Sequence, residues 1–431
     1  MADNFFYRAF RSLKKNRILL DSLIGTAFIF SLILMLHFFR FLGESSFFDP
    51  IGDAIGDVEF TDIVFSELRE DPEVDTSIVL VNIGNLNRRD IASQIEILNS
   101  CDPALIAIDG YFWAPKEDTL GDILLSEALI NSPNLVVASK LTYNPISGYY
   151  DSIAFSDSMF MQGVQGYANL ETEALEQHQF KVCRSFPPVF TINGQQHLSF
   201  AVRIARRFDA RATSEFLDRG NKAETINYRG NILDYGQTRF GGRYMALDVE
   251  DVLKRRFEPG ALKGKILLLG YLGDSFDDRS WEDKFFTPLN IKYAGRSNPD
   301  MFGVVVHANI ISMILKRDYI NKQSDTSSYL WALIICFGNV WLFTVIYHRL
   351  PNWYDGLTKG IQILEVMVIL TFNVVVFHWF GYKTNLTLAT ISVALASDGL
   401  EVCYGVLMNL FSSSGRRQIF SIHREPKRIS V

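Results

Sequence analysis

The chain has 431 residues, of which 48 % are apolar, 13 % aromatic and 21 % charged, so disorder, a collagen-like fibre and a disulfide-stapled miniprotein are excluded. The formal net charge of -6 argues against a nucleic-acid-binding surface on the chain as a whole. The charge is uneven, because residues 43–328 carry 28 Lys/Arg against 41 Asp/Glu and the rest of the chain carries 14 against 7. We therefore expect basic, membrane-associated segments on both sides of an acidic domain.

The first apolar run predicts a transmembrane helix over residues 18–42, after a basic segment at 1–17. Ser22 to Phe39 contain no Asp, Glu, Lys or Arg, and at about 1.5 Å per residue they nearly cross a hydrocarbon layer roughly 30 Å thick. A cleaved signal peptide is the alternative, but its apolar core usually has about 7–15 residues and ends in small residues. This run ends Leu-His-Phe-Phe-Arg, which favours an uncleaved anchor.

Residues 43–328 predict an external α/β layered domain with a mostly parallel sheet. Four short runs rich in β-branched residues are typical of buried parallel strands. They are Ser77–Ile83, Ala104–Ile108, Leu135–Ala138 and Lys265–Leu269. Helical patterns over Arg89–Asn99 and Leu120–Ile130 separate the first three runs, and this alternation favours an α/β layered fold.

Two further parts of this domain are predicted in outline. Residues 163–242 are richer in Gly and polar residues and indicate a hairpin-bearing insertion with one helix from Leu198 to Phe208. A last helix over Val305–Tyr319 leads almost directly into the second span. A shift in the domain can reach the membrane through it.

Three more apolar runs predict transmembrane helices at residues 329–347, 361–380 and 385–411. Five Lys/Arg precede the first span and five lie in the tail, 412–431, and positive flanks stay cytoplasmic. Four crossings place both termini inside, so the large domain lies outside. The remaining cytoplasmic pieces are too short to bury a core, and we expect any output to come from a partner.

Polar residues in the spans predict a seam between helices. Asp398 and Glu401 share a face of the fourth span, and depth arithmetic places Asn373 near Asp398 and Asn339 near Glu401. Glu365 interrupts the third span. Hydrogen bonds that join helices are one interpretation of this seam, and an ion or proton path is the other. We favour the first, because the sequence offers the acids no basic partner.

The sequence offers little for catalysis or cofactors. Gly273-Asp274-Ser275 after a strand resembles the nucleophile block of a lipase-like hydrolase, but no Asp-x-x-His or Gly-x-Asn-Asp pattern completes such a site. We expect no enzyme activity, no cofactor and no metal site, since no Cys/His spacing or phosphate loop is present. Cys101 and Cys183 can form one disulfide in an oxidising compartment only if their Cα atoms come within about 7 Å.

The external region resembles the CHASE domain of type two, the cyclases/histidine kinases associated sensory extracellular domain. The resemblance covers about residues 45–320 and rests on five runs in order: "PALIAIDGYF", "KVCRSFPPVF", "LKGKILLLG", "FFTPL" and "GVVVHANIISMILKRDYI". Three spans after the domain are that family's usual arrangement. Members commonly carry a kinase or cyclase after those spans, so this chain resembles the sensor without its effector. It departs at "VNIGNLNRRD", where the family tends to have acidic residues and Trp-Pro-Arg.

Five residues are candidate ligand contacts. Asp109 follows a buried strand, at the edge where α/β sheets place ligand-contacting groups. The resemblance places Asp278 or Asp283, Thr287 and His307 among the family's recurrent polar positions. Carboxylates and an imidazole suit a cation or an amine-bearing ligand. The alternative is structural, because such residues also cap turns, shape loops and satisfy backbone groups.

We therefore expect a membrane-anchored sensor or receptor-like subunit that signals through partner proteins, placed in a bacterial inner membrane. The resemblance to sensors implies a homodimer, and the partners expected are the lipid bilayer, another membrane or signalling protein and an unknown small ligand, with no nucleic acid. A structural or assembly subunit of a cell-envelope complex is the second interpretation. An ion or proton pathway through the acidic transmembrane residues is the third.

Overall fold

The computed structural model describes residues 17–42, 60–170, 182–233, 238–276, 281–291 and 298–408. The chain divides into two compact units, one of Asp53–Ile320 and the other of Met1–Gly52 together with Asn321–Val431. We call them the α/β unit and the helical unit.

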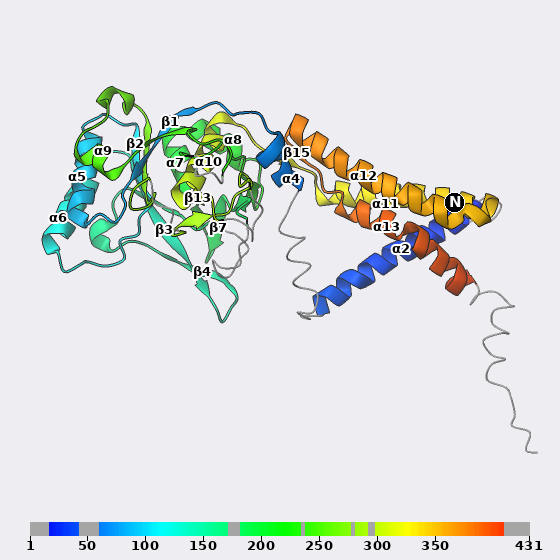
Figure 1. The fold of residues 1–431 in the computed structure, drawn as a ribbon. Helices are drawn as coiled ribbons and strands as arrows, with labels where there is room; N and C mark the ends of the chain where they lie inside the picture. The colour runs from blue at the N-terminus through cyan, green and yellow to red at the C-terminus, as the bar shows by residue number, and fades with distance from the viewer. Residues whose placement is uncertain are drawn as a thin grey trace, which may run out of the picture. The chain divides into compact units, whose positions relative to one another are not determined.

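The main sheet of the α/β unit is mostly parallel, as the sequence predicts (Figure 1). Its strands run in the order β10-β1-β11-β2-β3-β4, and β5 also pairs with β3. Only the β3–β4 pair is antiparallel. The bounds are β1 Asp75–Asn82, β2 Leu105–Ile108, β3 Leu135–Asn144, β4 Tyr149–Ala154, β5 Val164–Tyr167, β10 Tyr244–Leu247 and β11 Ile266–Gly270. The four predicted strands correspond to β1, β2, β3 and β11.

Helices pack on both faces of this sheet. Alternate strand residues such as Val79 and Val81 join one buried cluster with α5, α6 and α9, because successive side chains of a strand point to opposite faces. On the other face, α10 approaches β11 so closely that a Cβ on Gly270 would lie 2.6 Å from Val304 Cγ2. The helices are α5 Arg88–Asn99, α6 Thr119–Ile130, α7 Phe200–Phe208, α8 Ala210–Leu217, α9 Val249–Leu253 and α10 Gly303–Lys316.

The predicted insertion contains a hairpin and two helices rather than one. β7 and β8 meet at Asn193-Gly194, where both residues have positive φ, as a tight two-residue hairpin requires. The Ser199 side chain caps α7 by accepting a hydrogen bond from Val202 N, and Asp209 separates α7 from α8 by capping the second helix. Small strands complete the unit: β6 Ser185–Phe186, β7 Val189–Ile192, β8 Gln195–Leu198, β9 Glu224–Thr225, β12 Lys284–Phe285 and β13 Met301–Phe302.

The described part of the α/β unit also has four further short helices. They are α4 Phe60–Ile63, the π-helix η1 Val64–Leu68, and the 3-10 turns η2 Ser158–Phe160 and η4 Pro259–Ala261. The first two form the start of the α/β unit after the first apolar helix.

Among its described residues, the helical unit contains three helices long and apolar enough to cross a membrane: Ile18–Met35, Asp325–Arg349 and Pro351–Phe380. They lie within α2 Arg17–Leu42, α11 Asp325–Arg349 and η5 Pro351–Trp353 with α12 Tyr354–Phe380. The fourth predicted span is α13 Thr387–Val402, which continues as the π-helix η6 Cys403–Met408. It is shorter than those three, so a fourth span stays a prediction. Outside the membrane helices, β14 Asn321–Lys322 pairs with β15 Tyr382–Lys383.

Candidate functional site

Polar side chains collect where β1, β2 and β11 end. Asn82 closes β1, and its amide donates to Asp248 Oδ1 at 2.8 Å and to the Gly273 carbonyl at 3.0 Å. Its Oδ1 accepts from the backbone N–H groups of Gly84 and Leu272. Asn82 is therefore fully used in holding the loops of this sheet edge together, in the stretch where the sequence departs from the family pattern.

Asp109 and Asp283 lie close enough at this edge for their charges to interact. Within the part of the chain that the structure describes, neither carboxylate has a hydrogen bond or an ion pair. Burial raises the pKa of Asp109 to about 7. The pKa of Asp283 is also raised, first by desolvation of its carboxyl and then by the charges of Asp109 and Glu282. The residue is exposed by its accessible surface, so solvent screens part of this effect. The structure thus brings together two of the five predicted ligand contacts.

Thr287 and His307 have structural partners. Thr287 donates to Asp300 from its backbone N at 2.8 Å and from Oγ1 at 2.7 Å, and burial raises the pKa of Asp300 to about 7 despite these bonds. His307 lies 3.2 Å from the Ala168 carbonyl through Nε2, and burial lowers its pKa to about 4. Both arrangements favour the structural interpretation of these two residues. Asp278 lies outside the described residues.

The disulfide that the sequence left undecided is not formed in this structure. Cys101 and Cys183 are both free and buried. Cys101 belongs to the cluster formed with α5 and α6, whereas the Cys183 carbonyl accepts a hydrogen bond from Tyr228 at 2.8 Å. The two thiols are buried in different packing environments, which is why sequence alone could not pair them. Among the described residues, no group of His, Cys, Asp and Glu is arranged to hold a metal ion.

The segment that enters the α/β unit, residues 60–75, is held by arginines from distant parts of the sequence. We call it the connector. Arg184 pairs with Asp62 at 2.6 Å, and Arg239 donates to the Ser66 carbonyl at 3.0 Å. Further bonds run from Arg69 to the Tyr228 carbonyl at 2.6 Å and from Arg243 to Asp71 at 2.9 Å. The connector is therefore fixed to the unit along its length.

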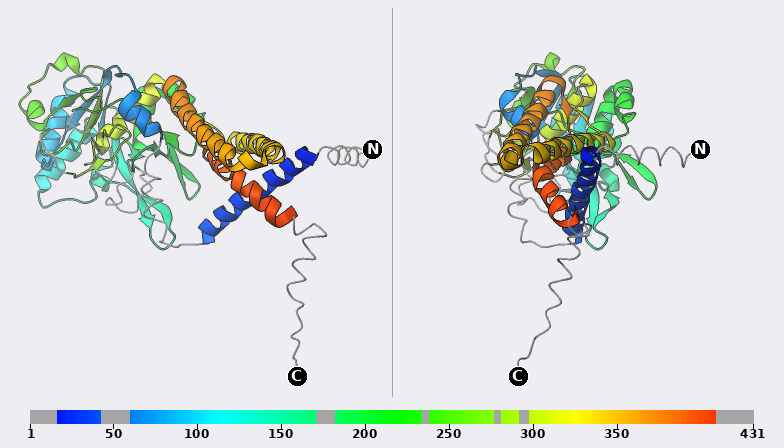
Figure 2. Two further views of the ribbon diagram at one scale, coloured as in Figure 1. Left: turned by 45° about the vertical axis from the view of Figure 1, so that its right-hand side comes forward. Right: turned by 90° about the vertical axis from the view of Figure 1, so that its right-hand side faces the viewer.

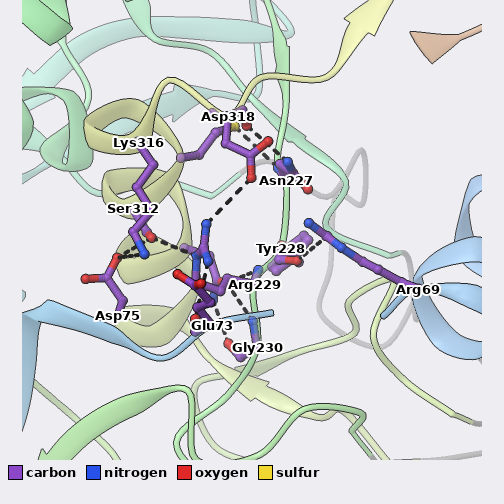
Figure 3. A network of polar contacts seen from close by, with 12 residues as sticks. Arg69, Glu73, Asp75, Asn227, Tyr228, Arg229, Gly230, Ser312, Lys316 and Asp318 are labelled. Atoms are coloured by element: carbon purple, nitrogen blue, oxygen red, sulfur yellow. Dashed lines mark hydrogen bonds and ion pairs between the residues drawn. The ribbon is translucent and has the colours of Figure 1, made fainter. Parts of the chain in front are cut away.

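The end of the connector meets α10 in a polar network, drawn in Figure 3. Asp75 accepts a hydrogen bond from Ser312 and lies 3.6 Å from Lys316 Nζ. Burial by itself raises the pKa of Asp75, but hydrogen bonds from Ser312 and Ser77 and the Lys316 charge outweigh it and hold the pKa below its usual value. Asp75 is 1 % exposed, so its charge depends on these partners.

Arg229 extends this network to both sides. Its guanidinium donates to Ser312 Oγ at 3.2 Å and to the Glu73 carbonyl of the connector at 3.3 Å, and it lies 3.6 Å from Asp318. The backbone N of Arg229 donates to Asn309 of α10 at 2.7 Å. We call Asp75, Arg229, Ser312, Lys316 and Asp318 the junction network. It joins the first strand after the connector to the helix that precedes the second span.

The chain leaving α10 is also held firmly. Arg317 pairs with Glu215, and Asn227 donates to the Asp318 carbonyl at 3.0 Å. The Arg219 guanidinium lies over the Tyr319 ring. On the helical unit, Gln323 N donates to the Lys383 carbonyl at 2.9 Å. The residues between α10 and α11 are therefore held by polar and ring contacts within each unit.

The resemblance includes a run that contains Arg184, but the sequence analysis assigned no role to Arg184, to the connector or to the junction network. Their partners lie far apart in sequence: Ser312 and Asp75 are separated by 237 positions. The only local signal was the acidic character of the connector, Glu-Asp-Pro-Glu-Val-Asp at 70–75. Without the fold, such a run is indistinguishable from a solvated surface segment.

Two residues of the predicted polar seam, Asp398 and Asn373, make polar contacts in the helical unit, but not with the expected partners. Asp398 is 2.6 Å from Lys359 Nζ, so the acid does have a basic partner. Asn373 accepts from Thr384 at 2.5 Å, and Asn339 donates to the Ile335 carbonyl of its own helix at 3.1 Å. Glu401 lies near the carboxylates of Asp355 and Asp398. The depth arithmetic placed Asn373 wrongly, because Asp398 lies beside Lys359 and Asn373 beside Thr384. It placed Asn339 correctly near the level of Glu401, since a Cβ on Gly25 would meet both Val340 and Leu400.

The fold and its two attachments define a membrane protein whose α/β domain is connected at both ends to apolar helices. Comparison with protein families gives a match to the CHASE2 domain over residues 45–346. The chain belongs to this family, and CHASE2 is an extracellular sensory domain. No match was found among curated proteins or among solved structures.

Proposed function

We propose that this protein is a sensor subunit of a bacterial inner membrane, which passes a conformational change in its external α/β unit to partner proteins through its membrane helices. The junction network carries the proposal, because it ties the connector that follows α2 to the helix that continues into α11. Both covalent routes to the membrane meet at Asp75, Arg229 and Ser312. A displacement of α10 therefore acts on both routes at once.

The signal is a shift between two states of the α/β unit. A ligand drives such a shift only as far as its affinities for the two states differ. The short, hydrogen-bonded passage from α10 to β14 supports transmission, since a flexible linker would absorb the displacement.

The exposed sheet edge suits an organic cation. Asp109 and Asp283 have raised pKa values and no hydrogen-bonded counter-ion among the described residues, so a bound cation would stabilise their ionised forms. Tyr111 and Trp113 follow Asp109 closely, Trp281 precedes Asp283, and all three rings are exposed, Trp113 by 74 %. Aromatic faces beside carboxylates bind amine or quaternary ammonium groups through charge and cation–π attraction.

Thermal unfolding of the full chain in detergent tests this ligand class. Choline and spermidine are expected to raise the melting temperature of the wild type, because a ligand that binds only the folded state stabilises it. The Asp109→Asn variant should lose the shift, and Asp218→Asn, an exposed carboxylate elsewhere, should keep it. Equal shifts in both variants would place any binding elsewhere.

The coupling is tested by distances between spin labels in the full chain in nanodiscs. Labels on Met35 of α2 and Leu330 of α11, both exposed, report the helices that the two routes enter. Arg229→Ala should change their distance distribution, because it removes bonds to the connector and α10 together. The matched variant Arg211→Ala, whose pair with Glu215 is exposed, should not. An unchanged distribution in both variants contradicts the proposal.

The orientation of the domain is tested separately in cells. In the proposed arrangement both termini are cytoplasmic and the α/β unit is external. A cysteine introduced at Ile146, which is 96 % exposed, should react with a membrane-impermeant maleimide in spheroplasts, and the native thiols, all buried, give a low background. Labelling that requires lysis of the cells would reverse the orientation and remove the sensor proposal.

A further inference from the structure

Helix α2 crosses α11 and α13 at glycines. A Cβ on Gly25 would lie 2.9 Å from Val340 Cγ1 and 3.1 Å from Leu400 Cδ1, and a Cβ on Gly399 would lie 2.8 Å from Ile29 Cγ1. All three distances are shorter than ordinary van der Waals contact, so a larger residue at either glycine would force the facing side chains to shift. Figures 1 and 2 show that α2 and α13 cross each other.

On one side of the crossing, α2 is fastened. Asp21 is 6 % exposed, accepts a hydrogen bond from Tyr404 Oη at 3.3 Å and lies 3.7 Å from His348 Nε2. The Tyr404 ring stacks on Tyr347, with centroids 5.0 Å apart. These groups come from α2, α11 and the segment after α13. We call Asp21, His348 and Tyr404 the latch.

On the other side of the crossing, α2 leaves the bundle. Ile33 is the last side chain of α2 in the buried cluster among the described ones. The helix continues to Leu42, and this far end leads toward the connector. Figures 1 and 2 show the backbone of the far end running away from α11 and α13.

We propose that α2 is a lever that pivots at the Gly25–Gly399 crossing, with the closed latch as one of its two positions. A helix that is fastened at one end, packed through glycines against neighbouring side chains in the middle and running away from the bundle at the other end (Figure 1) converts a displacement of its far end into an opposite displacement at the latch. Polar side chains do not obstruct this motion, because Ser22 and Thr26 bond to carbonyls of α2 itself. This inference rests on the proposed function for the origin of the displacement.

The test measures both ends of α2 in nanodiscs, in a full chain whose native cysteines are replaced. One spin-label pair, Ile18 and Leu350, reports the latch end, and the pair Met35 and Leu330 reports the far end. Opening the latch with Asp21→Ala should shift both mean distances, each by on the order of 2 Å. Tyr404→Phe, which keeps the ring and removes only the donor, should shift both in the same senses by less.

A second pair of variants tests the pivot. Gly25→Leu pushes α2 away at the crossing, and in this background Asp21→Ala should move the latch end without moving the far end. Gly338→Leu is the matched control on α11, because a Cβ at Gly338 meets open space, and it should leave the coupled shifts intact. If Asp21→Ala moves only the latch end in the wild-type background, α2 bends and the lever is refuted.

The same labels separate this inference from the proposed function. If Arg229→Ala moves neither end while Asp21→Ala moves both, the lever stands and the proposed coupling of the α/β unit fails. If Arg229→Ala moves the far end and leaves the latch end in place, the coupling stands and the lever is refuted.

Discussion

Arg184 and Asp62 lie 122 positions apart and meet through two hydrogen bonds, 3.1 Å from Nε and 2.6 Å from Nη2. The pair is mostly removed from solvent, with 17 % and 11 % of the two side chains exposed. A fork of two parallel bonds fixes orientation as well as distance. Asp62 belongs to α4, so this contact sets where the connector begins on the α/β unit.

Arg184→Ala is expected to lower the free energy of unfolding by about 2 kcal/mol, because hydrogen bonds to charged groups contribute about 1.5–3 kcal/mol and Asp62 is left without its partner. Arg184→Lys should recover only part of the loss, since an ammonium cannot form the fork. Thermal and urea unfolding of the full chain in detergent measures both. Arg211→Ala, in an exposed pair, should stay within about 0.5 kcal/mol of wild type, and an equal loss there would show that charge alone matters.

Ser312→Ala tests the junction network. The substitution removes the hydroxyl that donates to Asp75, whose carboxylate is buried. A carboxyl whose pKa is lower in the folded state than in the unfolded state stabilises the fold at pH values above the unfolded-state pKa. This stabilisation is lost as the pH falls through the folded-state pKa. Without Ser312 the pKa of Asp75 rises, so acid unfolding should begin at higher pH than in wild type. Ser100→Ala, whose hydroxyl is exposed, should leave the acid midpoint unchanged.

Asp300 is expected to give the opposite pH dependence. Its pKa, raised to about 7 by burial, lies above the ordinary value of 3.8, so between these pH values the folded state keeps a proton that the unfolded state releases. Stability therefore falls as pH rises through this window, by up to about 1.4 kcal/mol per pH unit. The Asp300→Asn variant should not show this decrease. Its free energy of unfolding should therefore increase relative to that of the wild type between pH 4 and pH 7.

The melting temperature of the full chain measured from pH 4 to pH 8 checks this expectation. Asp218→Asn is the control, because the exposed Asp218 side chain should keep the wild-type profile. Parallel profiles for wild type and Asp300→Asn would show that Asp300 stays ionised in the fold, held by its bonds from Thr287.

The sequence predicted the elements better than the contacts between them. The four apolar runs became β1, β2, β3 and β11, because buried strands are marked by local composition. The position of β11 between β1 and β2 could not be predicted, since periodicity carries no information on strand order. The same holds for the site: Asp109 was placed at the sheet edge by its local context, whereas the bond from Ser312 to Asp75 depends on how α10 crosses β1.

Lys359 and Asp398 offer the sharpest test of the seam, because their pairing was the least expected. Their ammonium and carboxylate are 2.6 Å apart, with 49 % and 62 % of the side chains exposed on the helical unit. In a bilayer, a charge without its partner is costly, so Lys359→Met and Asp398→Leu should each destabilise the packing of α12 on α13. The loss of stability in the double variant should be smaller than the sum of the two single losses, because no charged side chain is then left without a partner.

Unfolding of the full chain by SDS titration, followed by tryptophan fluorescence, measures all three variants. Strictly additive losses would mean that water or lipid headgroups, and not the pair, satisfy these charges. A recovery in the double variant would instead assign the Lys359–Asp398 pair to helix packing.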